Sequence, residues 1–315
     1  MEVKSGLSPP DIGGKKRKCM KEKIKYTDEP HISTPRWKLP PAVSTVAING
    51  YDMAYLERGQ GAPVVLVHGS LNDYRAWVSQ MESFSKIYRT IAVSLRHCYP
   101  EPWNGRDDDF SVRQHADDLA WFIKALNAGP VHLVGHSRGG DVVLIAAKEH
   151  PRIVRSVVLA DPAPLDRMLP QTEKVRAEAE KRRAFVAAAV KRLQKGDLDG
   201  GLEIFVNAVT RPGTWKRLPE AAKQIHRDNA WSLNSLLSDA QEPFGCADAQ
   251  KITAPVLLVA GEKSPFLYGM MHASLEPCLR RPQKVRIPDA SHAMNREKPE
   301  AFNAGVLRFL AECQP

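Results

Sequence analysis

The chain lacks any apolar segment long enough to cross a membrane. A spanning helix needs about 20 consecutive apolar residues, and runs such as 255–261 fall far short of that length. The first residues also lack the apolar stretch of a secretory signal peptide, because prolines and the basic run 15–18 occupy that part of the chain. We therefore expect a cytoplasmic protein with no membrane partner.

Cysteine is scarce, and its spacing shows no pairing. The five cysteines are scattered over the whole chain, at Cys19, Cys98, Cys246, Cys278 and Cys313. A zinc site would show closely spaced cysteine or histidine pairs, and a disulfide framework usually shows an even number of cysteines. The sequence thus predicts neither a metal site nor a disulfide.

Positive charge exceeds negative charge only modestly outside the N-terminal segment. The 315 residues contain 45 Lys and Arg against 36 Asp and Glu, a net charge of +9. Residues 1–40 alone carry +5 of this, which leaves +4 for the rest of the chain. So weak a field does not indicate a nucleic-acid-binding face, and we expect no such partner. We interpret residues 1–40 as a basic, disordered extension, with nucleic-acid binding through 15–18 as the alternative.

Short apolar segments alternate with helical patterns over most of the chain. The segments are 64–67, 91–95, 131–134, 154–160, 256–260 and, more weakly, 285–287. Mostly apolar strands are typical of a sheet covered by helices on both faces. The alternation therefore predicts an α/β fold with a doubly wound, mostly parallel sheet, whose core is formed by residues 41–164 and 251–315.

Two local signals mark the ends of elements. An Asn-Gly dipeptide separates the segments 43–48 and 51–56, which favours a tight hairpin turn between two antiparallel strands. Ser111 followed by Gln114 fits a capping box at the start of a helix. Both signals agree with the α/β alternation that follows them.

Between residues 165 and 250 the alternation stops. Helix-forming residues dominate there and no strand pattern occurs. We interpret 165–250 as an inserted helical lid over a pocket, most of whose apolar side chains attach it to the core. Trp231 in this insertion and Trp103 in the long loop after 91–95 are the candidates for substrate binding.

The strongest chemical signal is the sequence Gly-His-Ser-Arg-Gly at 135–139. The apolar segment 131–134 comes directly before it and a helical pattern from Val142 follows, which is the strand-turn-helix setting of a nucleophile elbow. The flanking glycines are needed because side chains at those positions would collide with the neighbouring strand and helix. Ser137 is therefore predicted to project from a strained turn above the carboxyl edge of the sheet.

With these motifs the chain resembles the α/β-hydrolase superfamily. The resemblance extends over about 43–310 and rests on the elbow, on His-Gly-Ser at 68–70 and on Ser-His-Ala at 291–293. It implies a nucleophile, an acid and a histidine in that chain order. Ser137 would be the nucleophile and His292 its base, because a serine hydroxyl is a poor nucleophile until a base takes its proton.

The acid is where this chain departs from the commonest pattern of the superfamily. Relatives usually read Gly-Glu-x-Asp after the seventh strand, whereas this chain has Ser264 in place of the aspartate. A serine cannot carry the charge that stabilises an imidazolium. Asp161, at the end of the sixth predicted strand, is the preferred candidate, because haloalkane dehalogenases and certain lactone hydrolases carry their acid there. Glu262 is the alternative.

The resemblance further implies an oxyanion hole made by the backbone N–H groups of Ser70 and Arg138. Such donors stabilise the negative charge that develops on the carbonyl oxygen during acyl transfer. It also implies that no metal and no organic cofactor is required.

The implied reaction is hydrolysis of a carboxylic ester or lactone, a small-molecule acyl substrate, through an acyl-enzyme. Haloalkane dehalogenases and epoxide hydrolases need an aspartate where this chain has Ser137, so those activities are disfavoured. Carbon–carbon bond hydrolases, amidases and cofactor-free haloperoxidases keep the same triad and remain alternatives, as does a ligand receptor with little turnover. The sequence leaves the oligomeric state open.

Overall fold

The computed structural model describes residues 37–106, 109–238 and 243–314. Its strands are β1 (Val43–Ile48), β2 (Tyr51–Arg58), β3 (Pro63–Val67), β4 (Arg89–Val93), β5 (Val131–His136), β6 (Val154–Ala160), β7 (Val256–Gly261) and β8 (Gln283–Ile287). They form one sheet in the order β1-β2-β4-β3-β5-β6-β7-β8, antiparallel at β1–β2 and β2–β4 and parallel elsewhere. The predicted α/β fold is confirmed. The proposed extension, except for 37–40, lies outside the described residues.

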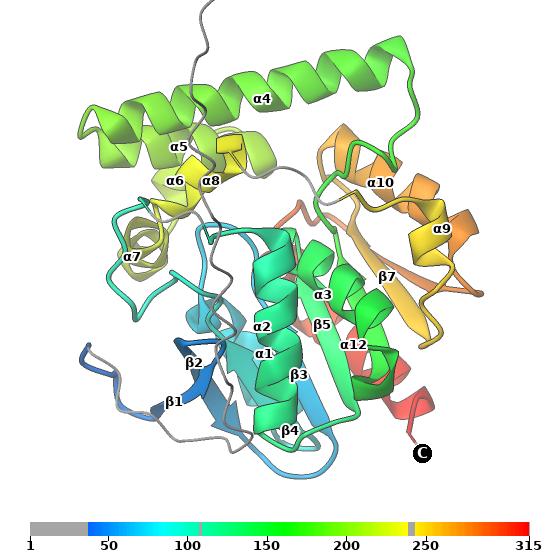
Figure 1. Ribbon diagram of the computed structural model, residues 1–315. Coiled ribbons are helices and arrows are strands. Elements are labelled where there is room, and N and C mark those ends of the chain that lie inside the picture. The colour runs from blue at the N-terminus through cyan, green and yellow to red at the C-terminus, as the bar shows by residue number, and fades with distance from the viewer. Residues whose placement is uncertain (1–36, 107–108, 239–242, 315) are drawn as a thin grey trace, which may run out of the picture.

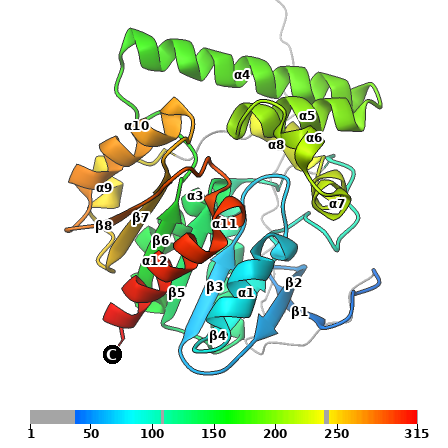
Figure 2. The ribbon, with the colours of Figure 1, turned by 180° about the vertical axis from the view of Figure 1, so that it is seen from behind.

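Helices cover both faces of the sheet. The helices α2 (Val112–Ala125) and α3 (Arg138–Glu149) lie in front of it in Figure 1, and α1 (Val78–Phe84) and α12 (Pro299–Glu312) lie in front of it in Figure 2. Every residue of β5 is buried between these layers, which explains why most of its residues are apolar. Within the described residues, no helix is both long and apolar enough to span a membrane.

The N-terminal hairpin forms as predicted. Ile48 pairs with Tyr51 across the two-residue turn. Asn49 and Gly50 have φ angles of 45° and 71°, the positive values that this tight turn requires. The hairpin joins the sheet through β2, which pairs with β4.

Helix α2 begins where the sequence predicts. The hydroxyl of Ser111 accepts a hydrogen bond from the backbone N–H of Gln114 at 3.0 Å. The side chain of Gln114 donates to Asp118 at 2.9 Å instead of returning to Ser111, so only one half of the expected capping box forms. The single cap is enough to satisfy one of the orphan donors at the start of the helix.

The regular elements that the structure describes between β6 and β7 are all helices, joined by loops. These helices are α4 (Glu173–Gln194), α5 (Leu198–Val209), α6 (Thr214–Arg217), α7 (Glu220–Asp228), α8 (Ser232–Ser238) and α9 (Cys246–Ala249). Apolar side chains of α4, α5 and α8 form a cluster of their own, and Leu71 of the loop after β3 belongs to it. The insertion therefore packs on the sheet edge at which the parallel strands end, as both views show (Figures 1 and 2).

The chain returns to the core after the insertion. Strand β7 is followed by α10 (Phe266–Leu275) and the single turn η3 (Glu276–Cys278), and β8 is followed by α11 (Met294–Glu297). Two further single turns, η1 (Tyr74–Trp77) and η2 (Pro151–Ile153), precede α1 and β6.

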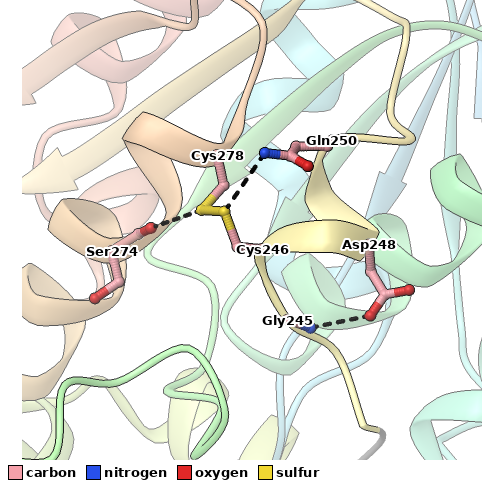
Figure 3. Close-up of a disulfide and its surroundings, with 6 residues drawn as sticks. All are labelled: Gly245, Cys246, Asp248, Gln250, Ser274 and Cys278. Carbon is pink, nitrogen blue, oxygen red and sulfur yellow. Dashed lines mark hydrogen bonds between the residues drawn. A yellow bond between two sulfur atoms is a disulfide. The ribbon is translucent and has the colours of Figure 1, made fainter.

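A disulfide joins Cys246 to Cys278, so the expectation of no disulfide is wrong (Figure 3). The two residues are 32 positions apart in sequence, but α9 packs against η3 and brings their Cα atoms to 5.1 Å. Spacing along the chain does not reveal a contact that depends on how two distant helices pack. Cys98 and Cys313 are free. Disulfides persist mainly in oxidising compartments, which bears against the cytoplasmic expectation.

Replacing both Cys246 and Cys278 with serine should lower the free energy of unfolding by about 3 to 4 kcal/mol, because the cross-link closes a loop of roughly 30 residues in the unfolded chain. Urea unfolding without reductant measures the loss. Cys313→Ser removes a free thiol and is the matched control, which should unfold at the wild-type urea concentration. Equal midpoints for the double variant and the wild type would show that the bond does not stabilise the fold.

Candidate active site

Ser137 occupies the sharp turn between β5 and α3. Its φ and ψ are 54° and −128°, a backbone conformation that residues other than glycine rarely adopt. The neighbours have no room for side chains: a Cβ at Gly135 would lie 2.4 Å from the carbonyl oxygen of Gly139, and one at Gly139 would lie 2.3 Å from that of Val67. The backbone N–H of Ser137 donates to Ala160 O at 3.0 Å, which ties the turn to β6. The elbow geometry thus follows from the glycine pattern.

The loop after β3 lies directly against Ser137. A Cβ at Gly69 would be 2.7 Å from the Cβ of Ser137, so only glycine permits this approach. The buried imidazole of His68 fixes the loop: its Nδ1–H donates to Gly69 O at 2.8 Å, and its Nε2 accepts from Leu95 N–H at 3.0 Å. Burial lowers the pKa of His68, which favours this neutral form. Ser70 is thereby placed beside the nucleophile.

His292 lies in the loop between β8 and α11, at the same sheet edge as Ser137. Its side chain is buried, and its Nδ1 is 3.4 Å from Oδ2 of Asp161. The carbonyl oxygen of His292 accepts a hydrogen bond from His136 Nε2 at 2.7 Å. Burial lowers the pKa of His136 to about 3, so His136 is a neutral structural donor that positions the His292 loop.

Asp161 follows β6 directly and is completely buried. Besides His292, its carboxylate accepts hydrogen bonds from His272 Nε2 at 3.1 Å and from the Ser264 hydroxyl. Burial raises the pKa of Asp161, but the bonds from His272 and His292 outweigh this effect and hold the pKa below its usual value. The residue is therefore an ionised carboxylate in contact with the imidazole of His292.

The alternative acid, Glu262, lies elsewhere. Its exposed carboxylate accepts from the backbone N–H of Asp289 at 2.9 Å. Within the described residues it makes no hydrogen bond to His292. Ser264, at the position where relatives usually have the aspartate, instead supports Asp161 through its hydroxyl.

Tyr268 of α10 contacts two of the three proposed catalytic side chains, His292 and Ser137. Its ring stacks on that of His292 with centroids 4.0 Å apart, and its hydroxyl is hydrogen-bonded to the Ser137 side chain. Burial raises the pKa of Tyr268 to about 12, so the phenol stays protonated. No hydrogen bond among the described residues joins Ser137 directly to His292. Hydrogen bonds of a catalytic pair are often completed only when substrate is bound.

Tyr268→Phe should raise the rate at which a fluorophosphonate labels Ser137 by about two- to tenfold, because the serine no longer has to give up a hydrogen bond of about 0.5 to 1.5 kcal/mol. Tyr268→Ala also removes the ring that packs on His292 and should lower the rate. The second-order rate constant of labelling measures both. Slower labelling of the phenylalanine variant would show that the phenol assists Ser137.

Two chambers meet at Ser137. The α4 chamber is named for Arg182 of α4 and is lined by Ser70, Val112, Ser137, Arg138, Asp141, Ala163, Pro164, Leu165, Arg182, Phe205, Val209, Leu236 and Tyr268. The α11 chamber is named for Arg296 of α11 and is lined by Gly69, Ser70, Leu71, Asn72, His136, Ser137, Phe205, Val206, Val209, Thr210, His226, Tyr268, His292, Ala293 and Arg296. Phe205 and Val209 of α5 border both, so the insertion covers the nucleophile.

The two tryptophans expected to bind substrate line neither chamber. Trp103 is stacked between the rings of His97 and Phe110, at centroid distances of 4.8 and 5.0 Å. Trp231 packs beside Gly105, where a Cβ would lie 3.3 Å from the Cβ of the tryptophan. Both side chains stabilise the loop between β4 and α2 and its contact with the insertion.

The comparisons with known proteins agree with this geometry. A family model described as the alpha/beta hydrolase fold matches residues 62–299. The chain belongs to the alpha/beta hydrolase family. An (E)-2-((N-methylformamido)methylene)succinate hydrolase of Acinetobacter baylyi is 26% identical, over 81% of this chain and 93% of that protein. A 2-(acetamidomethylene)succinate hydrolase of Mesorhizobium japonicum is 27% identical, over 81% and 90%. Carboxylesterase CesB of Bacillus subtilis shares the fold, with a TM-score of 0.69 at 19% identity over 87% and 93% of the chains.

Sequence reasoning on this alpha/beta hydrolase missed Tyr268, His272 and Arg296. Tyr268 and His272 are four residues apart, which places them on one face of α10. This spacing, in the helix that follows β7, is the sequence signal that could have identified the two residues. Arg296 follows His292 by four residues in the same loop-to-helix segment. Among the described residues, no group of His, Cys, Asp and Glu side chains is arranged to hold a metal ion.

Proposed function

We propose that this alpha/beta hydrolase is a serine hydrolase that cleaves a carboxylic ester or lactone through an acyl-enzyme. The observation that carries the proposal is the position of Ser137, held in a strained turn at the sheet edge where His292 and the buried Asp161 also meet. Each of the three residues comes from a different strand end, and a hydrolytic triad requires this convergence.

The reaction begins with attack of the Ser137 hydroxyl on the carbonyl carbon of the substrate. His292 takes the proton of the hydroxyl, and the charge of Asp161 stabilises the imidazolium that forms. The hydroxyl first leaves Tyr268, to which it is bonded when no substrate is present. His292 then gives the proton to the leaving oxygen, and the acyl group remains on Ser137.

The tetrahedral intermediate carries its negative charge on the former carbonyl oxygen. The backbone N–H groups of Arg138 and Ser70 would stabilise it, since both residues border Ser137 in the α4 chamber. Arg138 is the first residue of α3, so its N–H belongs to the orphan donors of a helix start. Water then attacks the acyl-enzyme with His292 as base, and the acid is released.

The insertion acts as a lid in this proposal. Phe205 and Val209 of α5 line both chambers and so lie over Ser137. The apolar cluster that joins α4, α5 and α8 holds these helices together as one packed unit. A covered site excludes water from the oxyanion, which strengthens the hydrogen bonds that stabilise it.

A fluorophosphonate probe and a panel of 4-nitrophenyl esters and lactones test the proposal. A serine hydrolase is labelled at Ser137, located by peptide mass spectrometry, and turns over at least one ester or lactone at a steady rate. Absence of labelling at Ser137, or a single slow event without turnover, would contradict the proposal and support a ligand receptor instead.

Amide hydrolysis is the second candidate. The two relatives from Acinetobacter baylyi and Mesorhizobium japonicum are named as hydrolases of succinates that carry an amidomethylene group. A serine triad can cleave amides by the same acyl-enzyme route. Adding 2-(acetamidomethylene)succinate to the panel separates the candidates, because an amidase releases acetate from it with a higher kcat/KM than from any ester tested.

A further inference from the structure

Arg296 brings a positive charge to the wall of the α11 chamber, next to the nucleophile. Its side chain is partly buried, and its one hydrogen-bond partner among the described side chains is the neutral amide oxygen of Asn72, at 3.5 Å. The structure describes no carboxylate within ion-pair distance of it. Burying a guanidinium without a counter-ion is unfavourable unless a ligand supplies the negative charge.

Glu297, the acidic residue next to Arg296 in the sequence, already has other partners. Glu297 pairs with Arg211 at 2.9 Å and accepts hydrogen bonds from the backbone and side chain of Ser291. None of the described side chains that line the α11 chamber is an aspartate or a glutamate. Burial lowers the pKa of Arg296, and the negative charge of Glu297 only partly opposes this effect. An arginine nevertheless stays protonated in proteins, so the chamber carries an uncompensated positive charge.

His226 gives the same chamber a second polar group without a partner. Its side chain is 2% exposed, its Nδ1–H donates to Leu71 O at 2.9 Å, and its Nε2 has no hydrogen-bond partner among the described residues. Burial lowers the pKa of His226 to about 3, so Nε2 is a free acceptor at neutral pH. A buried polar atom left unsatisfied is costly unless a ligand group pairs with it. The chamber therefore presents a cation and, beside it, an acceptor for an N–H or O–H group.

We propose that the α11 chamber is a carboxylate subsite, in which Arg296 binds a carboxylate on the acyl part of the substrate. The proposal rests on the proposed hydrolysis at Ser137, because the chamber borders that residue and His292. The guanidinium presents planar, paired donors that match the two oxygens of a carboxylate. The preferred substrates are consequently esters, lactones or amides of dicarboxylic acids, with one carboxyl group cleaved and the other held by Arg296.

Two esters of equal chain length test the subsite by kinetics. They are 4-nitrophenyl hexanoate, which is neutral, and the mono-4-nitrophenyl ester of adipic acid, which has a carboxylate at the far end of the acyl chain. The ratio of their kcat/KM values, adipate over hexanoate, should fall at least tenfold in Arg296→Met, mainly through KM. Arg296→Lys keeps the charge and should retain part of the ratio. Lys298→Met removes an exposed charge two residues away and should leave the ratio unchanged.

A binding measurement separates the subsite from the proposed reaction. Free adipate should raise the melting temperature of the wild type and of Ser137→Ala, but not that of Arg296→Met. If no ester is cleaved and adipate still stabilises the wild type through Arg296, the hydrolysis fails and the subsite stands. Two results would overturn the subsite while the hydrolysis stands, provided that esters are cleaved. The first is an equal ratio of kcat/KM values in the wild type and Arg296→Met. The second is that adipate raises the melting temperatures of these two proteins equally, or raises neither.

Discussion

Asp161→Asn should lower kcat by about 10⁴-fold, the effect of removing the carboxylate that orients and stabilises a triad histidine. The substitution keeps the shape of the side chain but replaces the charge near Nδ1 of His292 with an amide. Burial raises the pKa of Asp161, yet hydrogen bonds from His272 and His292 hold it below its usual value, so the wild-type group is ionised when the imidazolium forms. The kcat for the best ester of the panel measures the loss.

Glu262→Gln is the matched control for this prediction. It neutralises an exposed carboxylate that bonds to the backbone of Asp289 and not to His292, so kcat should stay close to the wild-type value. Thermal melting of Asp161→Asn distinguishes a catalytic loss from unfolding, because the same carboxylate also binds His272 and Ser264. A large loss in Glu262→Gln with little change in Asp161→Asn would transfer the role of the acid to Glu262.

The parts of the site that depend on local sequence were predictable. The glycines at 135 and 139 mark the elbow because the start of α3 leaves no space for a Cβ at Gly135, and the end of β3 leaves none at Gly139. The start of α3 was placed too late, at Val142, because glycines are poor helix formers and hide the fact that the helix begins at Arg138. The position of Asp161 at the end of β6 followed from the apolar run before it.

The contacts between distant segments were not predictable in the same way. His272 binds Asp161 from 111 residues away, and this contact exists only because α10 packs against β7, the strand next to the one that Asp161 follows. The disulfide between Cys246 and Cys278 depends on the packing of α9 against η3. Trp103 was a candidate for the pocket by residue type alone, and its stacking with His97 and Phe110 directs it into the loop instead.

Ser137→Ala should reduce kcat by about 10⁶-fold, the scale on which loss of the nucleophile acts in serine hydrolases. The alanine has no oxygen to form the acyl-enzyme, while the N–H donors of the oxyanion hole and both chambers remain. The variant should therefore still bind substrate with an affinity near the wild-type KM, but it should not be labelled by a fluorophosphonate. Hydrolysis at a rate within tenfold of the wild type would show that another residue is the nucleophile.

Ser137→Gly separates the strain of the elbow from its chemistry. Both variants lack the hydroxyl, but glycine adopts a positive φ such as the 54° found here with little cost, whereas alanine has the same backbone restriction as serine. The glycine variant should therefore be more stable than the alanine variant by about 1 kcal/mol in urea unfolding. The gain equals the strain that the fold accepts in order to present a hydroxyl at this turn. A glycine variant no more stable than the alanine variant would mean that the turn is relaxed, and that packing around Gly69 and Gly139 alone holds Ser137 at the sheet edge.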